Sequence, residues 1–307
     1  MLHSLPSWND GVARQSIIDF VAAVTSEGAP SFVLPSDRIA VFDNDGTLWA
    51  EKPIYYQFQF AIDRVREVAD EHPEWKTKQP FKAALEGDYD TLARIGETAA
   101  ITLMAPTHVG KTTDEFIQTV AAWLAKARHP RFDRPYTDLV YQPMLELIRL
   151  LRAHSFKIYI VSGCGAEFMR IWSNRVYGIP PEHVIGSTVA TRFEIRHGLP
   201  VLVRERKIDF LDVGGGKPVG IDKFIGRRPI FAFGNSDSDH PMLQWTAAGS
   251  GPRLMGLVHH TDGNREWAYD RGSGVDHLDE ALGDARDKGW TLVDMKRDWN
   301  RVFSFEE

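Results

Sequence analysis

Cysteine and long apolar runs are both scarce in this sequence. Cys164 is the only cysteine among 307 residues, so no disulfide can form within the chain and nothing requires an oxidising compartment. A run of about 18 apolar residues, which a membrane-spanning helix would need, is missing. The opening segment MLHSLPSWNDGVARQ lacks a basic start followed by an apolar core, so we expect no signal peptide and a cytoplasmic location.

An excess of charge of one sign is also missing. The formal net charge is −6, with 43% hydrophobic and 25% charged residues, which is ordinary for a globular protein. This balance gives no general attraction to nucleic acid or to an anionic membrane, so we expect neither as a partner. An anionic substrate would therefore need a well-placed lysine or a metal ion.

Short apolar runs alternate with amphipathic segments over most of the chain. Buried strands are predicted at 38–43, 157–163, 228–236 and 252–260. Their near-continuous apolar character is typical of parallel strands, and the alternation with helices favours a doubly wound, mostly parallel α/β core. We also expect a short strand at 183–187, a hairpin over 188–207, a single helix over 166–178, and a helix with an edge strand over 272–299.

Residues 48–136 differ from the rest because strand signals nearly vanish. Three segments with helical spacing of apolar residues lie at 55–73, 89–104 and 112–130. A structureless loop of this length would be rare. We therefore predict an all-helical domain at 48–136, inserted into a core domain formed by 1–47 and 137–307.

Polar clusters follow three of the predicted strands. They are Asp43-Asn44-Asp45, Ser162-Gly163 and Gly234-Asn235-Ser236-Asp237. Ligands of doubly wound sheets bind beyond the carboxyl ends of the strands. The three clusters are therefore expected to build one site.

Two acids one residue apart suit metal-assisted chemistry on phosphate. At about 4 Å and an effective dielectric near 20, two carboxylates repel by roughly 4 kcal/mol, and a phosphate dianion adds to this repulsion. A divalent cation offsets both terms, and oxygen ligands favour Mg²⁺. We interpret Asp43 as nucleophile and metal ligand, and Asp45 as general acid and then general base. If the chain turns after Asp43, Asp45 would instead bind metal through its backbone carbonyl. Gly46 and Thr47 are expected to form a tight turn with free N–H groups for an oxyanion.

The segment FDNDGT resembles the first motif of the haloacid dehalogenase-like (HAD) superfamily, hhhhDxDG(T/S). In order along the chain, IYIVSG, GGGKPVGI and FAFGNSDSDHPM resemble the second, third and fourth motifs. The resemblance implies a Rossmann-like fold and a Mg²⁺-dependent phosphatase that acts on a small phosphorylated metabolite through an aspartyl-phosphate. The helical insertion resembles the type 1 cap of the phosphoserine-phosphatase-like branch.

The resemblance also implies a role for individual residues. Catalytic roles fall to Asp43 and Asp45, phosphate binding to Asn44, Ser162, Gly163 and Lys217, and metal binding to Asp43, Asp45 and Asn235. The fourth motif usually begins with aspartate, but Asn235 stands at this position and adds no charge. Asp239 matches the second acid of that motif, and Asp237 is an alternative ligand.

Substrate selection is assigned to residues of the helical insertion. Glu51 lies just past the first motif, and Arg94, Thr102 and Lys111 are further candidates for substrate contacts. Trp49 is expected to line the site.

Each assignment has a structural alternative. Ser162 and Asn235 would also serve as helix caps, Asp237 as a capping acid or a solvated loop acid, and Lys217 as a surface lysine. Cys164 is expected to be a buried packing residue, and the pair His259-His260 has no evident partners for a metal.

Other functions on the same fold stay open. A phosphotransferase or mutase would use the same residues, whereas a carbon–halogen hydrolase lacks the second acid that Asp45 supplies. Asn235 keeps open a catalytically weak phosphate-binding regulatory protein.

Overall fold

The computed structural model describes residues 5–273 and 277–306. The chain divides into two compact units. The sheet unit comprises the described parts of Met1–Ala50, Thr137–Ser187 and Leu211–Glu307. The helical unit comprises Glu51–Tyr136 and Thr188–Phe210.

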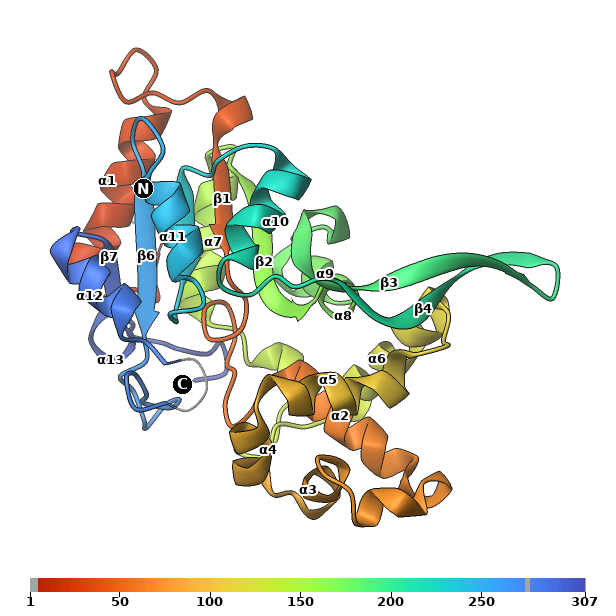
Figure 1. Cartoon of the computed structure of the whole chain (residues 1–307). Helices are drawn as coiled ribbons and strands as arrows, with labels where there is room; N and C mark the ends of the chain where they lie inside the picture. Colours follow the sequence, from red (N-terminus) through yellow and green to blue (C-terminus); the bar gives the residue numbers. More distant parts are fainter. Residues whose placement is uncertain (1–4, 274–276, 307) are drawn as a thin grey trace. The chain divides into compact units, whose positions relative to one another are not determined.

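Seven strands within the described residues form one sheet in the order β4-β3-β2-β1-β5-β6-β7 (Figure 1). Their bounds are β1 Ile39–Phe42, β2 Lys157–Gly165, β3 Val184–Arg196, β4 Leu199–Phe210, β5 Phe231–Gly234, β6 Leu254–His259 and β7 Thr291–Asp294. All neighbouring pairs are parallel except β3 and β4. The predicted doubly wound, mostly parallel sheet is thus confirmed.

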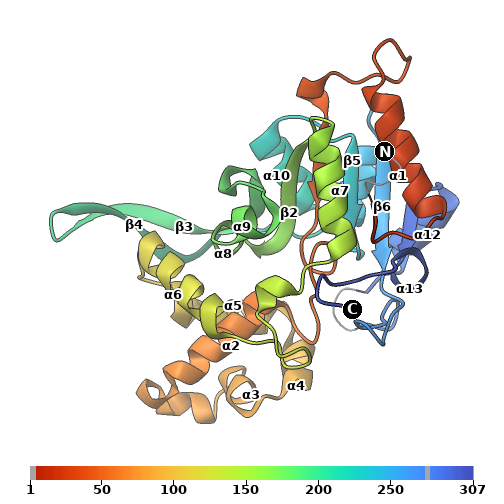
Figure 2. The same ribbon diagram turned by 180° about the vertical axis from the view of Figure 1, so that it is seen from behind.

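Helices cover both faces of this sheet. Those of the sheet unit are α1 Val12–Thr25, α7 Gln142–Ala153, α8 Ala166–Arg170, α9 Ser173–Tyr177, α10 Gly216–Ile225, α11 His240–Ala247, α12 Glu280–Asp287 and α13 Met295–Asp298. α10, α11 and α12 lie on one face, and α1 and α7 on the other (Figures 1 and 2). The single helix predicted over 166–178 is wrong, since α8 and α9 are separate helices. In the predicted helix over 272–289, residues 274–276 lie outside the described residues, and α12 begins at Glu280.

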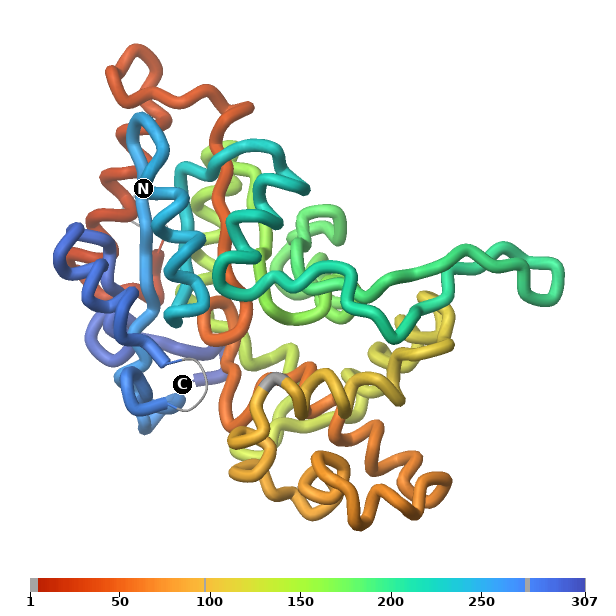
Figure 3. Tube along the Cα trace, viewed as in Figure 1, coloured from red at the N-terminus to blue at the C-terminus, as the bar shows by residue number. Residues whose placement is uncertain are grey.

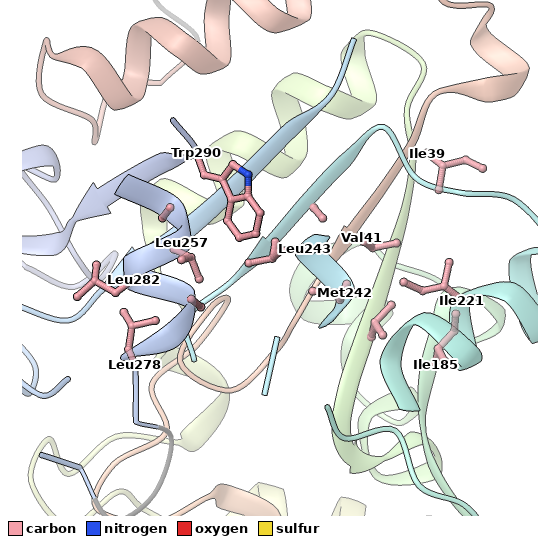
Figure 4. Close-up of a cluster of buried hydrophobic side chains, with 14 residues drawn as sticks. Ile39, Val41, Ile185, Ile221, Met242, Leu243, Leu257, Leu278, Leu282 and Trp290 are labelled. Carbon is pink, nitrogen blue, oxygen red and sulfur yellow. The ribbon is translucent and has the colours of Figure 1, made fainter. Parts of the chain in front are cut away.

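The strand β1 is apolar throughout because both of its faces are buried. Ile39 and Val41 join the core cluster under α10, α11 and α12 (Figure 4). Phe42 points to the opposite face, where its ring packs against Phe231 and Phe233 at centroid distances of 5.7 and 6.1 Å. Alternate side chains of a strand face opposite sides, so a two-sided core requires an unbroken apolar run.

The strand register brings the polar clusters to one edge of the sheet. Phe42 pairs with Ile160 of β2 and with Phe233 of β5. The Cα trace shows β1 and β2 running side by side although they are far apart in the sequence (Figure 3). The segments that follow β1, β2 and β5 therefore begin close together.

The helical unit has its own core. Its helices are α2 Tyr56–Glu67, α3 Phe81–Glu86, α4 Tyr89–Ile95, α5 Glu97–His108 and α6 Thr113–Lys126. α6 begins with a capping box, in which Thr112 Oγ1 accepts the Glu115 N–H and the Glu115 carboxylate accepts the Thr112 N–H. The buried cluster of this unit includes Ile62, Trp75 and Leu103.

This unit is not helical throughout, which differs from the all-helical insertion that we expected. The outer part of β3 and the whole of β4 form a hairpin that belongs to it. The backbones of Arg204 and Lys111 hydrogen-bond at 2.9 Å, and Val203 is buried. A hairpin was expected here, but its long-range attachment to the segment before α6 has no local sequence signal.

Short 3₁₀ turns complete the secondary structure at Pro35–Asp37, Ala69–Glu71, Pro73–Lys76, Tyr136–Asp138 and Pro181–His183. Among the helices of the described residues, none has the length and apolar character needed to cross a membrane.

Candidate active site

The chain turns immediately after β1 and closes on itself. The Asn44 carbonyl accepts the Thr47 N–H at 3.2 Å, and the Gly46 N–H donates to the Trp49 carbonyl at 2.9 Å. Gly46 has a φ of 71°, in the left-handed region that glycine adopts at least cost. The turn itself thus uses the N–H groups of Gly46 and Thr47, and our expectation that they are free for an oxyanion is wrong.

Lys217 lies between two buried carboxylates. Its Nζ is 2.6 Å from Asp43 Oδ1 and 2.5 Å from Asp239 Oδ1. Burial alone would lower the pKa of Lys217, but the carboxylates of Asp239 and Asp43 outweigh burial and raise it. Lys217 is therefore a charged ammonium inside the sheet unit, not a surface lysine, and it meets Asp43 as the motif order predicts.

The buried charges of this cluster do not balance. Burial raises the pKa of Asp43 well above its usual range, and the carboxylates of Asp239 and Asp45 raise it further against the opposing effect of Lys217. Asp43, Asp45 and Asp239 are each at most 6% exposed. Ionisation of all three beside the Lys217 ammonium would leave a formal charge of −2, which a divalent cation would neutralise.

The donor atoms near Asp43 suit Mg²⁺. The described residues hold no cluster of three or more His, Cys, Asp or Glu side chains arranged for a metal. A bound ion would thus depend on an Asp43 carboxylate oxygen, the Asp45 backbone carbonyl and the Asn235 amide oxygen. An oxygen-only set that leaves positions for water is what Mg²⁺ prefers. The residues present fit this ion.

Asn235 and Asp239 are held in a network of hydrogen bonds. Thr47 Oγ1 donates to Asn235 Oδ1 at 3.0 Å. Asp239 Oδ2 accepts the N–H groups of Asn235 and Ser236 at 2.9 and 3.2 Å. Asp239 therefore fixes both Lys217 and the loop that carries Asn235.

Asp237 faces a different element. Its carboxylate accepts the N–H groups of Ala281 and Asp279 at 2.9 and 3.1 Å. It therefore caps the start of α12, where a negative charge is favourable, which confirms the expected capping role. Its alternative role as a metal ligand stays a prediction.

The Asp45 side chain is surrounded by donors. Trp49 Nε1 donates to its Oδ1 at 2.7 Å, Cys164 Sγ lies 3.0 Å from its Oδ2, and Ser162 Oγ lies 3.5 Å from the same oxygen. Ser162 Oγ also accepts the Cys164 N–H at 3.2 Å. Cys164 is partly exposed, so the expectation of a buried packing residue is wrong.

Two predicted phosphate ligands flank these groups. Asn44 is fully buried, its Oδ1 accepts from the Tyr177 hydroxyl at 3.0 Å, and its amide nitrogen has no hydrogen-bond partner among the described residues. Gly163 packs so closely that a Cβ there would lie 3.1 Å from Val213 Cγ2. The phosphate-binding roles of Asn44 and Gly163 stay predictions.

Asp212 is a buried acid that the motifs do not assign. It is fully buried, and burial raises its pKa to about 7, while the Lys217 ammonium and the Ser162 backbone N–H oppose this rise. Its position two residues before Gly214, the first residue of the GGGK segment, was the available signal.

His260, for which the sequence showed no partners for a metal, has two hydrogen-bond partners instead. Its Nε2 lies 2.8 Å from the Gly46 carbonyl, and its Nδ1 lies 3.0 Å from Glu266 Oε2. The ring therefore links the turn after β1 to the segment after β6. Glu266, six positions further along, is the partner that the sequence did not reveal.

The predicted substrate-selecting residues belong to the helical unit. Glu51, Arg94, Thr102 and Lys111 lie within Glu51–Tyr136, and their roles stay predictions. Lys111 lines a groove of about 1020 Å³ in this unit, and none of the other three lines it.

Comparisons with known proteins agree with the fold. A model of the haloacid dehalogenase-like hydrolases matches residues 40–244. A protein of unknown function from Bordetella pertussis Tohama I is 16% identical, with 84% of this chain and 98% of that chain covered and a TM-score of 0.53. A functionally unknown protein from Anaerococcus prevotii DSM 20548 is 15% identical, with 94% and 92% covered and a TM-score of 0.52. No curated protein matches the chain.

Proposed function

Since the chain belongs to the haloacid dehalogenase-like hydrolase family, we propose that it is a Mg²⁺-dependent phosphatase that hydrolyses small phosphomonoesters through a phosphorylated Asp43. The observation that carries the proposal is the buried contact of Lys217 with Asp43 and Asp239. Such an ammonium holds the nucleophile and offers a positive charge to a phosphoryl oxygen.

The site would bind the phosphoryl group through the Ser162 hydroxyl and the Lys217 ammonium. Mg²⁺, held by Asp43, the Asp45 carbonyl and Asn235, would neutralise and orient the phosphoryl oxygens. Asp43 and Asp45 lie two residues apart at the start of a hydrogen-bonded turn. The turn fixes their backbone and so limits the positions that their side chains can take relative to the substrate.

The first half of the reaction transfers the phosphoryl group. A carboxylate oxygen of Asp43 forms a bond to phosphorus while the bond from phosphorus to the ester oxygen breaks. The proton of Asp45 moves to that ester oxygen, so a neutral alcohol leaves and Asp45 becomes a carboxylate.

The second half restores the enzyme. Asp45 takes a proton from a water molecule whose oxygen attacks phosphorus, and the bond from phosphorus to Asp43 breaks. Inorganic phosphate leaves, and both aspartates return to their starting forms. The same residue thus serves as acid and then as base.

The substrate class follows from charge and domain organisation. A net charge of −6 gives no general attraction to nucleic acid or membranes, which supports a small phosphorylated metabolite as the partner. We propose that the helical unit acts as a cap that excludes water and bulky substrates. A panel of small phosphate esters, tested with the wild-type protein, would identify the substrate.

The test of this function is hydrolysis of p-nitrophenyl phosphate with and without Mg²⁺. Wild type should be active only with the metal, and Asp43→Asn should lose activity by roughly 10³-fold or more because the nucleophile is gone. Asp37→Asn, an exposed carboxylate paired with Arg227, is the matched control and should keep wild-type activity.

Two outcomes would contradict the proposal. Activity that survives in Asp43→Asn, or that needs no metal, excludes the phosphorylated intermediate or the role of Mg²⁺. Binding of a phosphate analogue without hydrolysis of any ester would instead indicate a phosphate-binding regulatory protein.

A further inference from the structure

We propose that Trp49 is a positioning residue that determines which carboxyl oxygen of Asp45 carries the catalytic proton. This inference rests on the proposed function, in which Asp45 is the general acid. It goes beyond that function because it assigns different tasks to the two oxygens of Asp45 and names the side chain that separates them.

The indole of Trp49 has little freedom to move. The residue is fully buried, and its carbonyl accepts the Gly46 N–H at 2.9 Å within the closed turn. Its ring stacks on Trp172 with a centroid distance of 4.2 Å and an interplanar angle of 24°. Backbone and ring are both fixed, so the indole N–H points in one direction, toward Asp45 Oδ1 at 2.7 Å.

An indole N–H only donates hydrogen bonds. Asp45 Oδ1 must therefore offer a lone pair to Trp49, which favours the form of the neutral acid that has its proton on Oδ2. This second oxygen lies 3.5 Å from Ser162 Oγ and 3.0 Å from Cys164 Sγ. Both groups donate to an ionised Asp45, but a hydroxyl and a thiol can also accept a hydrogen bond, so a proton on Oδ2 has an acceptor. Ser162 is a proposed phosphate ligand, so the proton is held on the side where the ester oxygen would leave.

Loss of the indole N–H would remove the hydrogen bond that keeps the proton off Asp45 Oδ1. The carboxyl group could then rotate, and the proton would spend less time on Oδ2. Esters of simple alcohols should suffer, because their alkoxides leave only when protonated. p-Nitrophenyl phosphate should be almost unaffected, because p-nitrophenolate leaves without a proton.

The experiment compares the kcat of Trp49→Phe on glycerol 1-phosphate and on p-nitrophenyl phosphate. We expect kcat to fall about 10- to 100-fold on the alkyl ester and less than about 3-fold on the aryl ester, in keeping with the usual size of general acid catalysis. Trp299→Phe is the matched control. Trp299 is another buried tryptophan of the sheet unit, and its N–H has no partner among the described residues, so both rates should stay within about 3-fold of wild type.

Incorporation of the benzothiophene analogue of tryptophan at position 49 provides a second variant. It keeps the size of the bicyclic ring and replaces N–H by sulfur, so it separates loss of the donor from loss of packing. The same selective loss on the alkyl ester is expected. A rate equal to wild type on both esters would overturn the proposal.

A double-mutant test separates this inference from the proposed function. In an Asp45→Asn background, Trp49→Phe should cause no further loss on the alkyl ester, because residues that act through one another are not additive. If wild type hydrolyses neither ester, or if Asp45→Asn shows no preference between leaving groups, the proposed function fails. If Asp45→Asn behaves as expected but Trp49→Phe slows both esters equally, only the role of Trp49 is refuted.

Discussion

Asp212 is a carboxyl group that lies in the sheet unit close to the candidate site but takes no part in the proposed reaction. It is fully buried, and burial raises its pKa to about 7, whereas an aspartate in an unfolded chain has a pKa near 4. Between about pH 4 and pH 7, the folded protein therefore binds more protons at this residue than the unfolded chain does. Its contribution to the free energy of unfolding falls as the pH rises through this range.

Asp212→Asn should remove this pH dependence. The amide resembles the neutral acid, so the variant should be about as stable as wild type near pH 4 and more stable by up to roughly 4 kcal/mol above pH 7. Urea denaturation at pH 4, 5, 6, 7 and 8 would measure the difference. Asp37→Asn, at an exposed site, serves as control, and a stability difference for Asp212→Asn that does not change with pH would refute the assignment.

At the scale of elements, the apolar pattern predicts where strands lie better than it predicts where strands and helices end. β1 was predictable because Ile39–Phe42 is buried on both faces. The predicted short strand at 183–187 and the separate hairpin proved to share one strand, β3, of 13 residues. The predicted helix over 166–178 ends early at Arg170 and resumes at Ser173. Between them lies Trp172, which stacks on Trp49 from a distant part of the sequence, and local periodicity cannot reveal such a contact.

Substitution by alanine at two glycines in different elements should change the free energy of unfolding in opposite directions. In β6, a Cβ at Gly256 would lie 2.1 Å from the ring of Phe233, which is fully buried, so Gly256→Ala should destabilise the protein by about 1–3 kcal/mol. In α12, a Cβ at Gly283 meets nothing within 4 Å.

Gly283→Ala should therefore stabilise the protein by about 0.5–1 kcal/mol, because alanine loses less backbone entropy in a helix. Chemical denaturation of both variants measures the two effects. Stability changes in the same direction for both variants would contradict either the close packing at Gly256 or the helical conformation at Gly283.

For the candidate site as a whole, the sequence predicted which residues gather there but not which contacts all of their side chains make. The order of the motifs identified Asp43, Ser162 and Lys217, because parallel strands end at one edge of the sheet. The orientation of Asp237 toward α12 and the contact of His260 with the turn after β1 depend on hydrogen bonds between remote segments. Such bonds leave no periodic signal in the sequence.

The whole molecule should be stabilised by Mg²⁺, since the ion would offset the repulsion among the buried carboxylates of Asp43, Asp45 and Asp239. At an Mg²⁺ concentration about 100 times its Kd, the gain is about 2.7 kcal/mol, which corresponds to a rise in Tm of several degrees. Thermal denaturation with Mg²⁺ and with a chelator measures this shift. Asp43→Asn should reduce the shift strongly, and an unchanged shift in that variant would place the ion elsewhere.

The position of β1 at the centre of the sheet has a consequence for biosynthesis. Its neighbours β2 and β5 come much later in the chain, and Lys217 follows Asp43 by 174 residues. Contacts between such distant residues form slowly, and a ribosome releases the N-terminal part first. The nascent protein therefore carries Asp43 and Asp45 without Lys217 until most of translation is complete. A complete candidate site is among the last features that the protein acquires.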